Sequence, residues 1–361
     1  MNKLMKDKQH TLITGGAGFI GTNLADRLLS QGKKVMIYDN LSRNGVEKNL
    51  QWLVDKYDNQ LFIQISDIKE KGILQECVNN ADQIFHFSGQ VAVTSSLINP
   101  VQDFEVNLAG TFNVLEAIRR SSNKPPLLFT SSNKVYGDLT NIRLIENATR
   151  YYPENEEINL NGVDESCPLN FHSPYGCSKG SADQYVLDYA RSFGLKAIVF
   201  RMSCIYGPHQ FGTEDQGWVA HFAISALENR PIVIYGDGKQ VRDILFVEDL
   251  IDAFILAQKN IHKISGNAFN IGGGPRNTVS LTEIIKLIQE QTGKPLNLAF
   301  EEWRIGDQQY YVSNINKFKN ATGWNPKFSV SEGVDRLISW LSDSRNISLE
   351  KNKIVSKAMV E

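Results

Sequence analysis

A tyrosine and a lysine four residues apart have the types and spacing to do acid–base chemistry. Tyr175 and Lys179 follow Ser173, which can cap a helix, and Pro174, which fits a first helical turn. The pair therefore lies on one face of a predicted helix. Because an ammonium group beside a phenol favours the phenolate, we expect the pKa of Tyr175 to fall from about 10 toward neutral pH. Such a tyrosine could take a proton from a hydroxyl group while hydride leaves the same carbon.

A serine at the end of a predicted strand could assist this pair. The strand expected over residues 127–130 runs into Ser131 and Ser132. A hydroxyl at Ser132 could hydrogen-bond the substrate oxygen that Tyr175 deprotonates. Alone, Ser132 would be an ordinary turn residue, and Tyr175 with Lys179 could be a solvated surface pair, so the rest of the chain has to decide.

A glycine-rich turn follows the first predicted strand, residues 11–14. The string TGGAGFIG occupies residues 14–21 and opens an amphipathic helix. Gly15 allows the tight turn, Gly18 lets the backbone approach a pyrophosphate, and Gly21 lets the helix pack close to the strand. Strand, turn and helix together predict a dinucleotide site.

The end of the second predicted strand, residues 35–38, distinguishes between the two nicotinamide dinucleotides. Asp39 lies 18 residues after Gly21, where a carboxylate bonds the adenosine ribose hydroxyls and repels a 2′-phosphate. The sequence therefore predicts NAD as the cofactor. Arg43 is near enough to keep NADP open as the alternative.

Strands and helices alternate along most of the chain, which predicts a parallel sheet covered by helices on both faces. Further strands are expected at residues 61–65, 84–87, 127–130 and 196–201, and polar or loop residues follow each of them. Because ligands bind at the carboxyl ends of such strands, these residues should gather at one edge. We predict an α/β fold: a Rossmann-type doubly wound parallel sheet with a smaller, discontinuous α/β substrate-binding lobe.

The expected parts are residues 8–205 plus 244–275 for the NAD-binding domain, 206–243 plus 276–345 for the smaller lobe, and 346–361 for a frayed tail. Residues 99–120 have a helical period, with Asn107 inside the helix. The polar segment 137–171 is expected to be a long loop, either over the site or as a solvated excursion.

Two arginines of the smaller lobe each closely precede an aspartate, Arg242 with Asp243 and Arg304 with Asp307. An arginine fork matches phosphate geometry, so two of them suggest a clamp for a diphosphate. Surface salt bridges are the alternative. Three polar side chains of a nearby loop could reach sugar hydroxyls: His209, Gln210 and Gln216.

Composition indicates an ordinary globular protein rather than a nucleic-acid or membrane binder. The chain has 361 residues, 42% hydrophobic and 22% charged, with a formal net charge of −2. The start has no apolar targeting segment, so we expect a cytoplasmic protein. The four cysteines form no C-x-x-C pair, so we expect neither a metal site nor a disulfide framework.

These motifs, together with VRD at residues 241–243, resemble the extended short-chain dehydrogenase/reductases that act on nucleotide sugars, over residues 8 to 342. Within that family the longer strings at 92–107, 131–139, 171–190 and 209–218 resemble the 2-epimerases that convert CDP-paratose to CDP-tyvelose. The resemblance implies an NAD-dependent epimerase that inverts C2 of a CDP-hexose through a transient 2-keto sugar. It also implies a homodimer or homotetramer and a role in lipopolysaccharide O-antigen biosynthesis.

The resemblance assigns roles to individual residues. The implied catalytic residues are Ser132, Tyr175 and Lys179. The implied cofactor-binding residues are Gly15, Gly18, Phe19, Ile20, Asp39, Asn40, Arg43, Asp67, Ile68, Phe87, Ser88, Gly89, Gln90, Asn107, Ser131, Tyr175, Lys179 and Met202. The implied substrate-binding residues are Thr94, Ser132, Asn133, Lys134, His209, Gln210, Gln216, Tyr235, Arg242, Arg304 and Asp307.

Three rival functions are weighed against this interpretation. A UDP-sugar 4-epimerase would share every catalytic residue. A 4,6-dehydratase of the family carries Asp-Glu where this chain has Asn133 and Lys134, which are not carboxylates. A non-catalytic NAD-binding scaffold would not need the intact catalytic set. Departures from the 2-epimerases at Ser132, at residues 201–204 and at 208–209 leave the hexose open: deoxygenated at C3 and C6, or fully hydroxylated.

Overall fold

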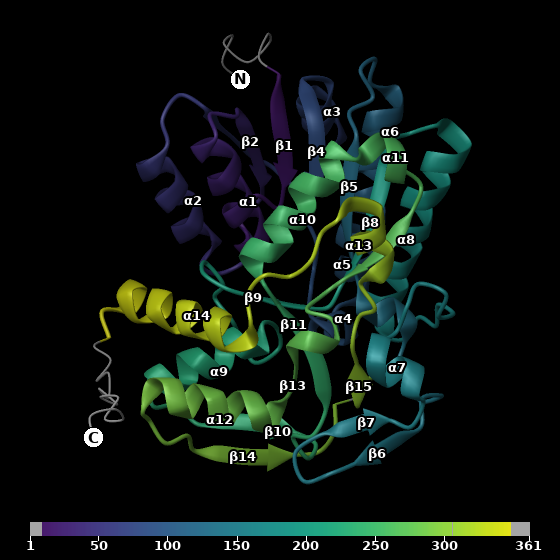
Figure 1. The fold of residues 1–361 in the computed structure, drawn as a ribbon. Helices are drawn as coiled ribbons and strands as arrows, with labels where there is room; N and C mark the ends of the chain where they lie inside the picture. The colour runs from purple at the N-terminus through teal and green to yellow at the C-terminus, as the bar shows by residue number, and fades with distance from the viewer. Residues whose placement is uncertain (1–8, 305, 348–361) are drawn as a thin grey trace, which may run out of the picture.

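A central sheet of seven parallel strands organises the molecule (Figure 1). The computed structural model describes residues 9–304 and 306–347, so residues 348–361 of the predicted tail lie outside the described residues. The strand order is β12 (Ala268–Ile271), β8 (Ala197–Met202), β5 (Leu127–Ser132), β4 (Ala81–His86), β1 (His10–Thr14), β2 (Val35–Asp39) and β3 (Leu61–Ile65). The order reverses direction between β1 and β4, which opens a crevice at their carboxyl ends. This confirms the predicted Rossmann-type doubly wound fold.

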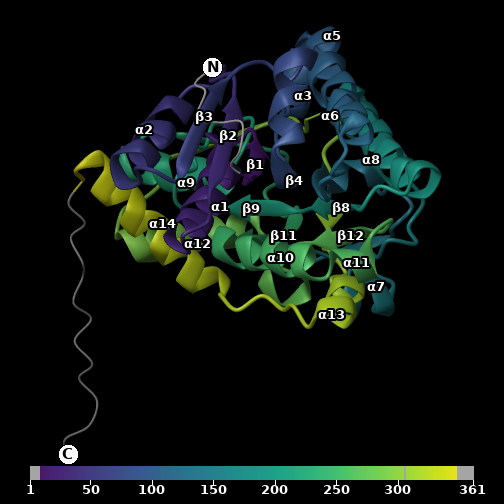
Figure 2. The same ribbon diagram turned by 90° about the horizontal axis from the view of Figure 1, so that it is seen from above.

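The strands are continuous apolar runs because both faces of the sheet are buried. Leu12 of β1 and Met36 of β2 point into one core, and Ile13 and Ile37 point into the other. Figure 2 shows helices on both sides of the sheet. The first core is covered by α3 (Lys71–Asn79), α6 (Gly110–Arg120) and α8 (Ser173–Phe193). The second is covered by α1 (Phe19–Ser30), α2 (Val46–Lys56), α10 (Val247–Lys259) and α11 (Ile261–Ile264).

The helix expected over residues 99–120 is present from Pro100 to Arg120, but it contains a π-helical segment that the prediction did not include. The segment comprises α5 (Pro100–Asp103), a π-helical turn η2 (Phe104–Ala109) and α6, and a separate helix α4 (Val93–Ile98) precedes it. Asn99 caps α5 by accepting a hydrogen bond from Gln102 N at 3.1 Å. The wide π turn carries Asn107, and such turns occur mostly at functional sites.

The polar segment 137–171 contains regular structure, contrary to the expected long loop. After the short helix η3 (Asn133–Tyr136) come an antiparallel hairpin of β6 (Leu144–Glu146) and β7 (Tyr151–Pro153), and then α7 (Glu156–Asn161). Tyr151 N donates to Lys239 O at 3.1 Å, and Arg150 pairs with Glu283, so the hairpin is docked on the smaller lobe. Such short strands need these tertiary contacts to form.

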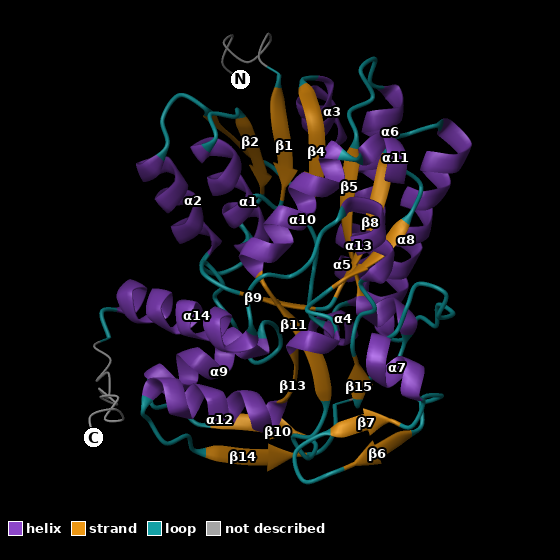
Figure 3. Ribbon diagram, in the orientation of Figure 1, coloured by secondary structure: helices purple, strands orange, loops and turns teal. Residues whose placement is uncertain are grey.

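The smaller lobe lies below the sheet in Figure 3. Its strands are β9 (Cys204–Tyr206), β11 (Val241–Phe246), β13 (Thr278–Ser280) and β15 (Tyr310–Tyr311), with β10 (Ile232–Tyr235) paired to β14 (Leu298–Glu301). Its helices are α9 (Trp218–Leu227), η4 (Pro275–Asn277), α12 (Leu281–Thr292) and α14 (Val330–Arg345). Phe318 of α13 (Asn316–Thr322) packs in the core of the first domain, although its number falls in the range expected for the smaller lobe. Among the described residues, no helix has the length and apolar character to cross a membrane.

Candidate active site

A pocket of about 500 Å³ opens between the seven-stranded sheet and the smaller lobe. Fifteen of the predicted site residues line it: Phe19, Ile20, Thr94, Ser131, Ser132, Asn133, Lys134, Tyr175, Met202, Gln210, Gln216, Tyr235, Arg242, Arg304 and Asp307. None of the other lining residues was assigned to the site from the sequence, and among them are Cys204, Glu214, Asp215, Trp218 and Gln240.

Tyr175 and Lys179 lie in the first two turns of α8, as predicted from the spacing. Ser173 accepts a hydrogen bond from Gly176 N at 3.2 Å, which stabilises the start of this helix. Both side chains of the pair are buried. Lys179 Nζ donates to Thr130 O at 2.6 Å and lies 4.5 Å from the centre of the Phe129 ring. The end of β5 thus holds the lysine in place.

Burial shifts the pKa values of this pair in opposite directions. It raises the pKa of Tyr175 to about 12, and a hydrogen bond from Ser132 opposes the rise. It lowers the pKa of Lys179 to about 8, and the charges of Asp103 and Asp183 oppose the fall. The expected fall in the Tyr175 pKa was therefore wrong for this structure, because the loss of solvation of the phenolate outweighs the stabilising contacts.

Ser132 ends β5 beside Tyr175 and caps η3 by accepting a hydrogen bond from Lys134 N at 3.2 Å. Other polar atoms of the pocket are buried and have no hydrogen-bond partner among the described residues: Thr94 Oγ1, Ser131 Oγ, Gln210 Oε1 and Gln240 Oε1. A buried polar atom without a partner costs about 1–3 kcal/mol. A ligand with several hydroxyl or amino groups would supply the missing partners.

The glycine turn after β1 has the close contacts that a dinucleotide cradle needs. Gly15 has φ +69°, and a methyl group on it would lie 2.7 Å from Ser88 N. A methyl group on Gly21 would lie 2.5 Å from Gly15 O. Helix α1 begins after Gly18 without a side-chain cap, which leaves amide groups of its first turn for an anion. These residues fit the pyrophosphate of NAD.

The end of β2 completes this cradle. Asp39 accepts hydrogen bonds from Ala17 N at 3.1 Å and from Leu41 N at 2.9 Å, so its carboxylate is fixed beside the glycine turn. Arg43, whose position kept NADP open, donates to Gln216 Oε1 across the pocket. The arginine is thus turned toward the smaller lobe, which favours NAD over NADP.

The remaining predicted cofactor residues surround the same sheet edge. Asn40 Nδ2 donates to Asp67 Oδ2 at 3.0 Å, and Ile68 is buried against Gly110. Phe87 stacks on Phe254 with ring centres 5.0 Å apart. These contacts join the ends of β2, β3 and β4 into one surface.

The segment after β4 connects the cofactor cradle to Lys179. Asn107 Nδ2 donates to Gln90 O at 3.0 Å, which fixes the backbone beyond Gly89. A methyl group on Gly89 would lie 2.8 Å from Asn107 Oδ1 and 3.8 Å from Lys179 Nζ. Glycine at this position therefore leaves open a small space that the amide and the ammonium share.

A partly buried charge cluster also lines the pocket. Arg242 Nη2 donates to Asp307 Oδ1 at 2.7 Å, and Lys134 Nζ lies 3.5 Å from the same oxygen. The two cations hold the pKa of Asp307 below its usual value despite burial. Asn133 Nδ2 donates to Gln308 Oε1 at 3.1 Å. The cluster carries two positive charges and one negative charge, so it favours an anionic ligand.

Arg304 is held at the mouth of the pocket by acidic residues of a loop. Its guanidinium stacks on Tyr235 at 3.8 Å, donates to Glu214 Oε1 at 2.8 Å and lies 3.4 Å from Asp215 Oδ1. Tyr235 also donates to Glu214. An anionic ligand would replace these carboxylates at the arginine.

His209 lies away from the pocket, contrary to its predicted role. Its ring packs between Trp52 and Trp340, with centroid distances of 4.3 and 5.2 Å, and its Nδ1 bonds Asn49 Oδ1 at 3.2 Å. Burial lowers the pKa of His209 to about 4, so it is neutral at physiological pH. It therefore connects the two lobes and does not face a sugar.

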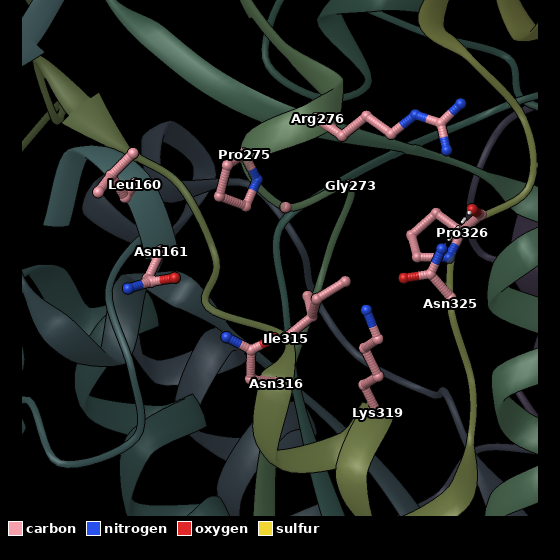
Figure 4. Close-up of a pocket in the computed structure, with 11 residues that line it drawn as sticks. Leu160, Asn161, Gly273, Pro275, Arg276, Ile315, Asn316, Lys319, Asn325 and Pro326 are labelled. Carbon is pink, nitrogen blue, oxygen red and sulfur yellow. Dashed lines mark hydrogen bonds between the residues drawn. The ribbon is translucent and has the colours of Figure 1, made fainter. Parts of the chain in front are cut away.

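A second cleft, of about 380 Å³, lies between α7, α13 and the turn after β12 (Figure 4). Arg276, Lys319, Asn161, Asn316 and Asn325 line it. None of the predicted site residues is there, and no acid–base pair faces it. The chemistry therefore belongs to the first pocket.

Two features of the site were missed from the sequence. Glu214 and Asp215 could have been found as acidic residues in a loop that carries sugar-binding candidates. Asp103, a buried carboxylate that acts on both Tyr175 and Lys179, lies one helical turn before Asn107, and that spacing was the available signal.

Comparisons with known proteins agree with this geometry. Residues 11–272 match the model of the NAD dependent epimerase/dehydratase family. The chain is 46% identical over 338 residues to CDP-paratose 2-epimerase of Salmonella typhi, covering 92% of this chain and 98% of that protein. It is 30% identical over 335 residues to a putative UDP-glucose 4-epimerase of Methanocaldococcus jannaschii, covering 92% and 98%.

Solved structures share the fold. A UDP-glucose 4-epimerase of Thermotoga maritima, solved with UDP-glucose, has a TM-score of 0.78 at 28% identity and covers 93% of this chain and 100% of its own. A UDP-glucose 4-epimerase of Thermus thermophilus, solved with NAD, has a TM-score of 0.76 at 28% identity and covers 92% and 99%.

Proposed function

The chain belongs to the NAD dependent epimerase/dehydratase family, and from this premise we propose that it inverts C2 of a CDP-hexose, converting CDP-paratose to CDP-tyvelose. The observation that carries the chemistry is the buried set Ser132, Tyr175 and Lys179. Ser132 and Tyr175 line a pocket that Arg242 and Asp307 also line, and Lys179 lies one turn after Tyr175 in α8. The choice of C2 and of a CDP-sugar is supported by the 46% identity to the Salmonella typhi enzyme. A product of this kind would serve lipopolysaccharide O-antigen synthesis in the cytoplasm.

The catalytic set would move one proton at the sugar. Tyr175 Oη would take the proton of the C2 hydroxyl, and Ser132 would hydrogen-bond the same oxygen. Tyr175 must be a phenolate before it takes this proton, and Lys179 would hold its positive charge near that phenolate and lower the cost of its charge. Bound NAD supplies a hydride acceptor and donor and the positive charge of its nicotinamide ring. The proton would return from Tyr175 to the oxygen of the 2-keto sugar after the sugar has turned over.

The smaller lobe would hold the nucleotide while the sugar turns. Arg242 and Arg304 would bind the diphosphate, and Tyr235 would pack beside it. The unpartnered atoms of Thr94 and Gln210 would accept or donate hydrogen bonds to sugar hydroxyls. Because these atoms are few, they would restrain the sugar without fixing one orientation.

The geometry argues against dehydration. Removing the C5 proton and expelling the C6 hydroxyl needs an acid and a base beside Ser132, where this chain has Asn133 and Lys134. Asp307 lies 3.5 Å from Lys134 Nζ, and two cations hold its pKa low, so it would not act as an acid. A UDP-sugar 4-epimerase remains the alternative, since only the orientation of the sugar would differ.

A substrate panel tests the proposal. Purified enzyme would be incubated separately with CDP-paratose, CDP-glucose and UDP-glucose, and each product identified from its proton coupling constants. We expect a C2 epimer from a CDP-sugar, and we expect Tyr175→Phe to convert it at least about 100-fold more slowly while still binding NAD. Conversion of UDP-glucose to UDP-galactose alone would establish the alternative. A wild type that is inert on all three would contradict the proposal.

We also propose that the protein is a homodimer or homotetramer assembled through α4, α5, η2, α6 and α8. Exposed apolar patches mark interaction surfaces, and these neighbouring elements expose several large apolar side chains: Leu97, Ile98, Val101, Phe104, Phe112 and Tyr185. Figure 2 shows α5, α6 and α8 along one flank of the molecule. Light scattering should give a multiple of 40.6 kDa, and Ile98→Asp should reduce it. A wild-type monomer would contradict this assembly.

A further inference from the structure

A buried carboxylate lies behind the catalytic pair and forms no salt bridge with any other described residue. Asp103 ends α5 and is fully buried. Its Oδ1 accepts a hydrogen bond from Asn107 Nδ2 at 3.0 Å, and its Oδ2 has no hydrogen-bond partner among the described residues. The hydroxyl of Ser178, the residue before Lys179 in α8, stabilises the charged form of the Asp103 carboxyl group. A buried carboxylate with so few partners is costly, so its position calls for a reason.

The hydrogen bond from Asn107 joins this carboxylate to the space in front of Lys179. Asn107 Nδ2 donates both to Asp103 Oδ1 and to Gln90 O, each at 3.0 Å. The amide orientation is therefore fixed, and Asn107 Oδ1 faces Gly89 without a partner among the described residues. Lys179 Nζ faces the same glycine. Asp103 thus determines which atom of Asn107 is turned toward the lysine.

The charge of Asp103 acts on both members of the pair. It favours the ammonium of Lys179 and disfavours the phenolate of Tyr175, so it raises both pKa values. The other titratable groups that face Lys179 are His86 of β4 and Asp183 of α8.

Neither of those two groups can replace Asp103. Burial lowers the pKa of His86 to about 3, so its ring is neutral. Asp183 receives two hydrogen bonds from the buried guanidinium of Arg201, at 2.9 and 3.0 Å. Its charge is therefore largely compensated, whereas the charge of Asp103 is not.

We propose that Asp103 is a positioning residue of the reaction: its buried negative charge keeps Lys179 protonated, and its hydrogen bond holds the Asn107 amide toward that ammonium. The inference rests on the proposed function, because its main assay needs turnover. The nearly isosteric variant Asp103→Asn removes the charge and keeps the size of the side chain.

The pH profile of turnover tests the proposal. For Asp103→Asn we expect both limbs of a bell-shaped profile to move to lower pH by about one unit, because loss of a negative charge favours deprotonation of Tyr175 and of Lys179 alike. Asp103→Glu should keep the wild-type limbs. Glu105→Gln is the matched control, because Glu105 lies two residues away, is partly exposed and pairs with Lys69, so the pH profile of this variant should not move.

Lower turnover with unmoved limbs in a folded Asp103→Asn protein would overturn the proposal, because a merely structural role predicts that result. If Asp103→Asn does not fold, Ser178→Ala takes its place. Loss of the Ser178 hydroxyl raises the pKa of Asp103. The acid limb of the Ser178→Ala pH profile should therefore move to lower pH, by less than in Asp103→Asn. An unmoved acid limb would overturn the proposal.

Unfolding supplies a readout that needs no turnover. Because the pKa of Lys179 is lowered to about 8 in the folded state, its contribution to stability increases with pH from about 8 to the ordinary pKa of the unfolded chain. Asp103→Asn should start this increase at lower pH, and an unchanged onset would overturn the proposal. A wild type inert on every nucleotide sugar would contradict only the proposed function.

Discussion

Adding one methyl group at Gly21 should weaken the binding of NAD. In Gly21→Ala the new carbon would lie 2.5 Å from Gly15 O, whereas ordinary contacts begin at 3.4 Å, so α1 and the glycine turn must separate by about 0.9 Å. Backbone atoms form this contact, so no side chain can turn away. Overpacking of this kind lowers the free energy of unfolding by about 1–3 kcal/mol, and the better helix propensity of alanine offsets about 1 kcal/mol of that loss.

The same displacement sets the size of the effect on NAD. A hydrogen bond of about 2.9 Å from the start of α1 to the pyrophosphate would lengthen to about 3.8 Å, which is too long to count as one. A hydrogen bond to a charged group contributes about 1.5–3 kcal/mol, so the Kd for NAD should rise about tenfold to a hundredfold. The assay is titration with NAD after removal of any bound cofactor, together with the thermal midpoint.

Gly72→Ala is the matched control. Gly72 lies in α3, and a methyl group there would meet nothing within 4 Å. This variant should bind NAD normally and gain up to about 1 kcal/mol from helix propensity. If Gly21→Ala bound NAD as tightly as Gly72→Ala, the close helix–turn contact would not be what forms the cofactor cradle.

Three further variants test the site. Wild-type activity should fall above pH about 8 as Lys179 loses its proton. The Lys179→Met variant should lack that fall, and the acid limb of its pH–rate profile should move to higher pH. If its pH–rate profile matched that of the wild type, Lys179 would have no part in the mechanism. Arg304→Ala should weaken binding of the nucleotide diphosphate about tenfold in calorimetry and leave NAD bound. Loss of NAD from this variant would mean that Arg304 binds the cofactor and not the substrate. Asp183→Asn leaves buried Arg201 unpaired, so the free energy of unfolding measured with denaturant should fall by about 3–5 kcal/mol. An unchanged unfolding midpoint would contradict the importance of that ion pair.

Local patterns were enough to predict much of the fold and the catalytic helix. The glycine turn, the acidic end of β2 and the Tyr175 helix each depend on residues close together in the chain, so periodicity and capping determine them. The buried strands were recognised because their apolar runs face two cores. Two of the predicted pocket residues, Ser132 and Met202, follow from the rule that strand ends meet at one edge.

The features that were missed depend on contacts between distant segments. His209 is placed by Trp52 and Trp340, which lie more than 100 residues away on either side. The π turn around Asn107 depends on hydrogen bonds to Asp103 and Gln90 that a helical period does not reveal. The raised pKa of Tyr175 reflects burial by the whole fold, which sequence spacing cannot supply.

The most direct test of the central claim is proton NMR of CDP-paratose incubated with the purified enzyme in D₂O without added cofactor. We expect inversion at C2 with no deuterium at that carbon, because the hydride that leaves C2 would return to it from tightly held NAD while only the hydroxyl proton exchanges. Deuterium at the inverted carbon would contradict the hydride mechanism. Inversion at C4 would contradict the assignment of the reaction to C2.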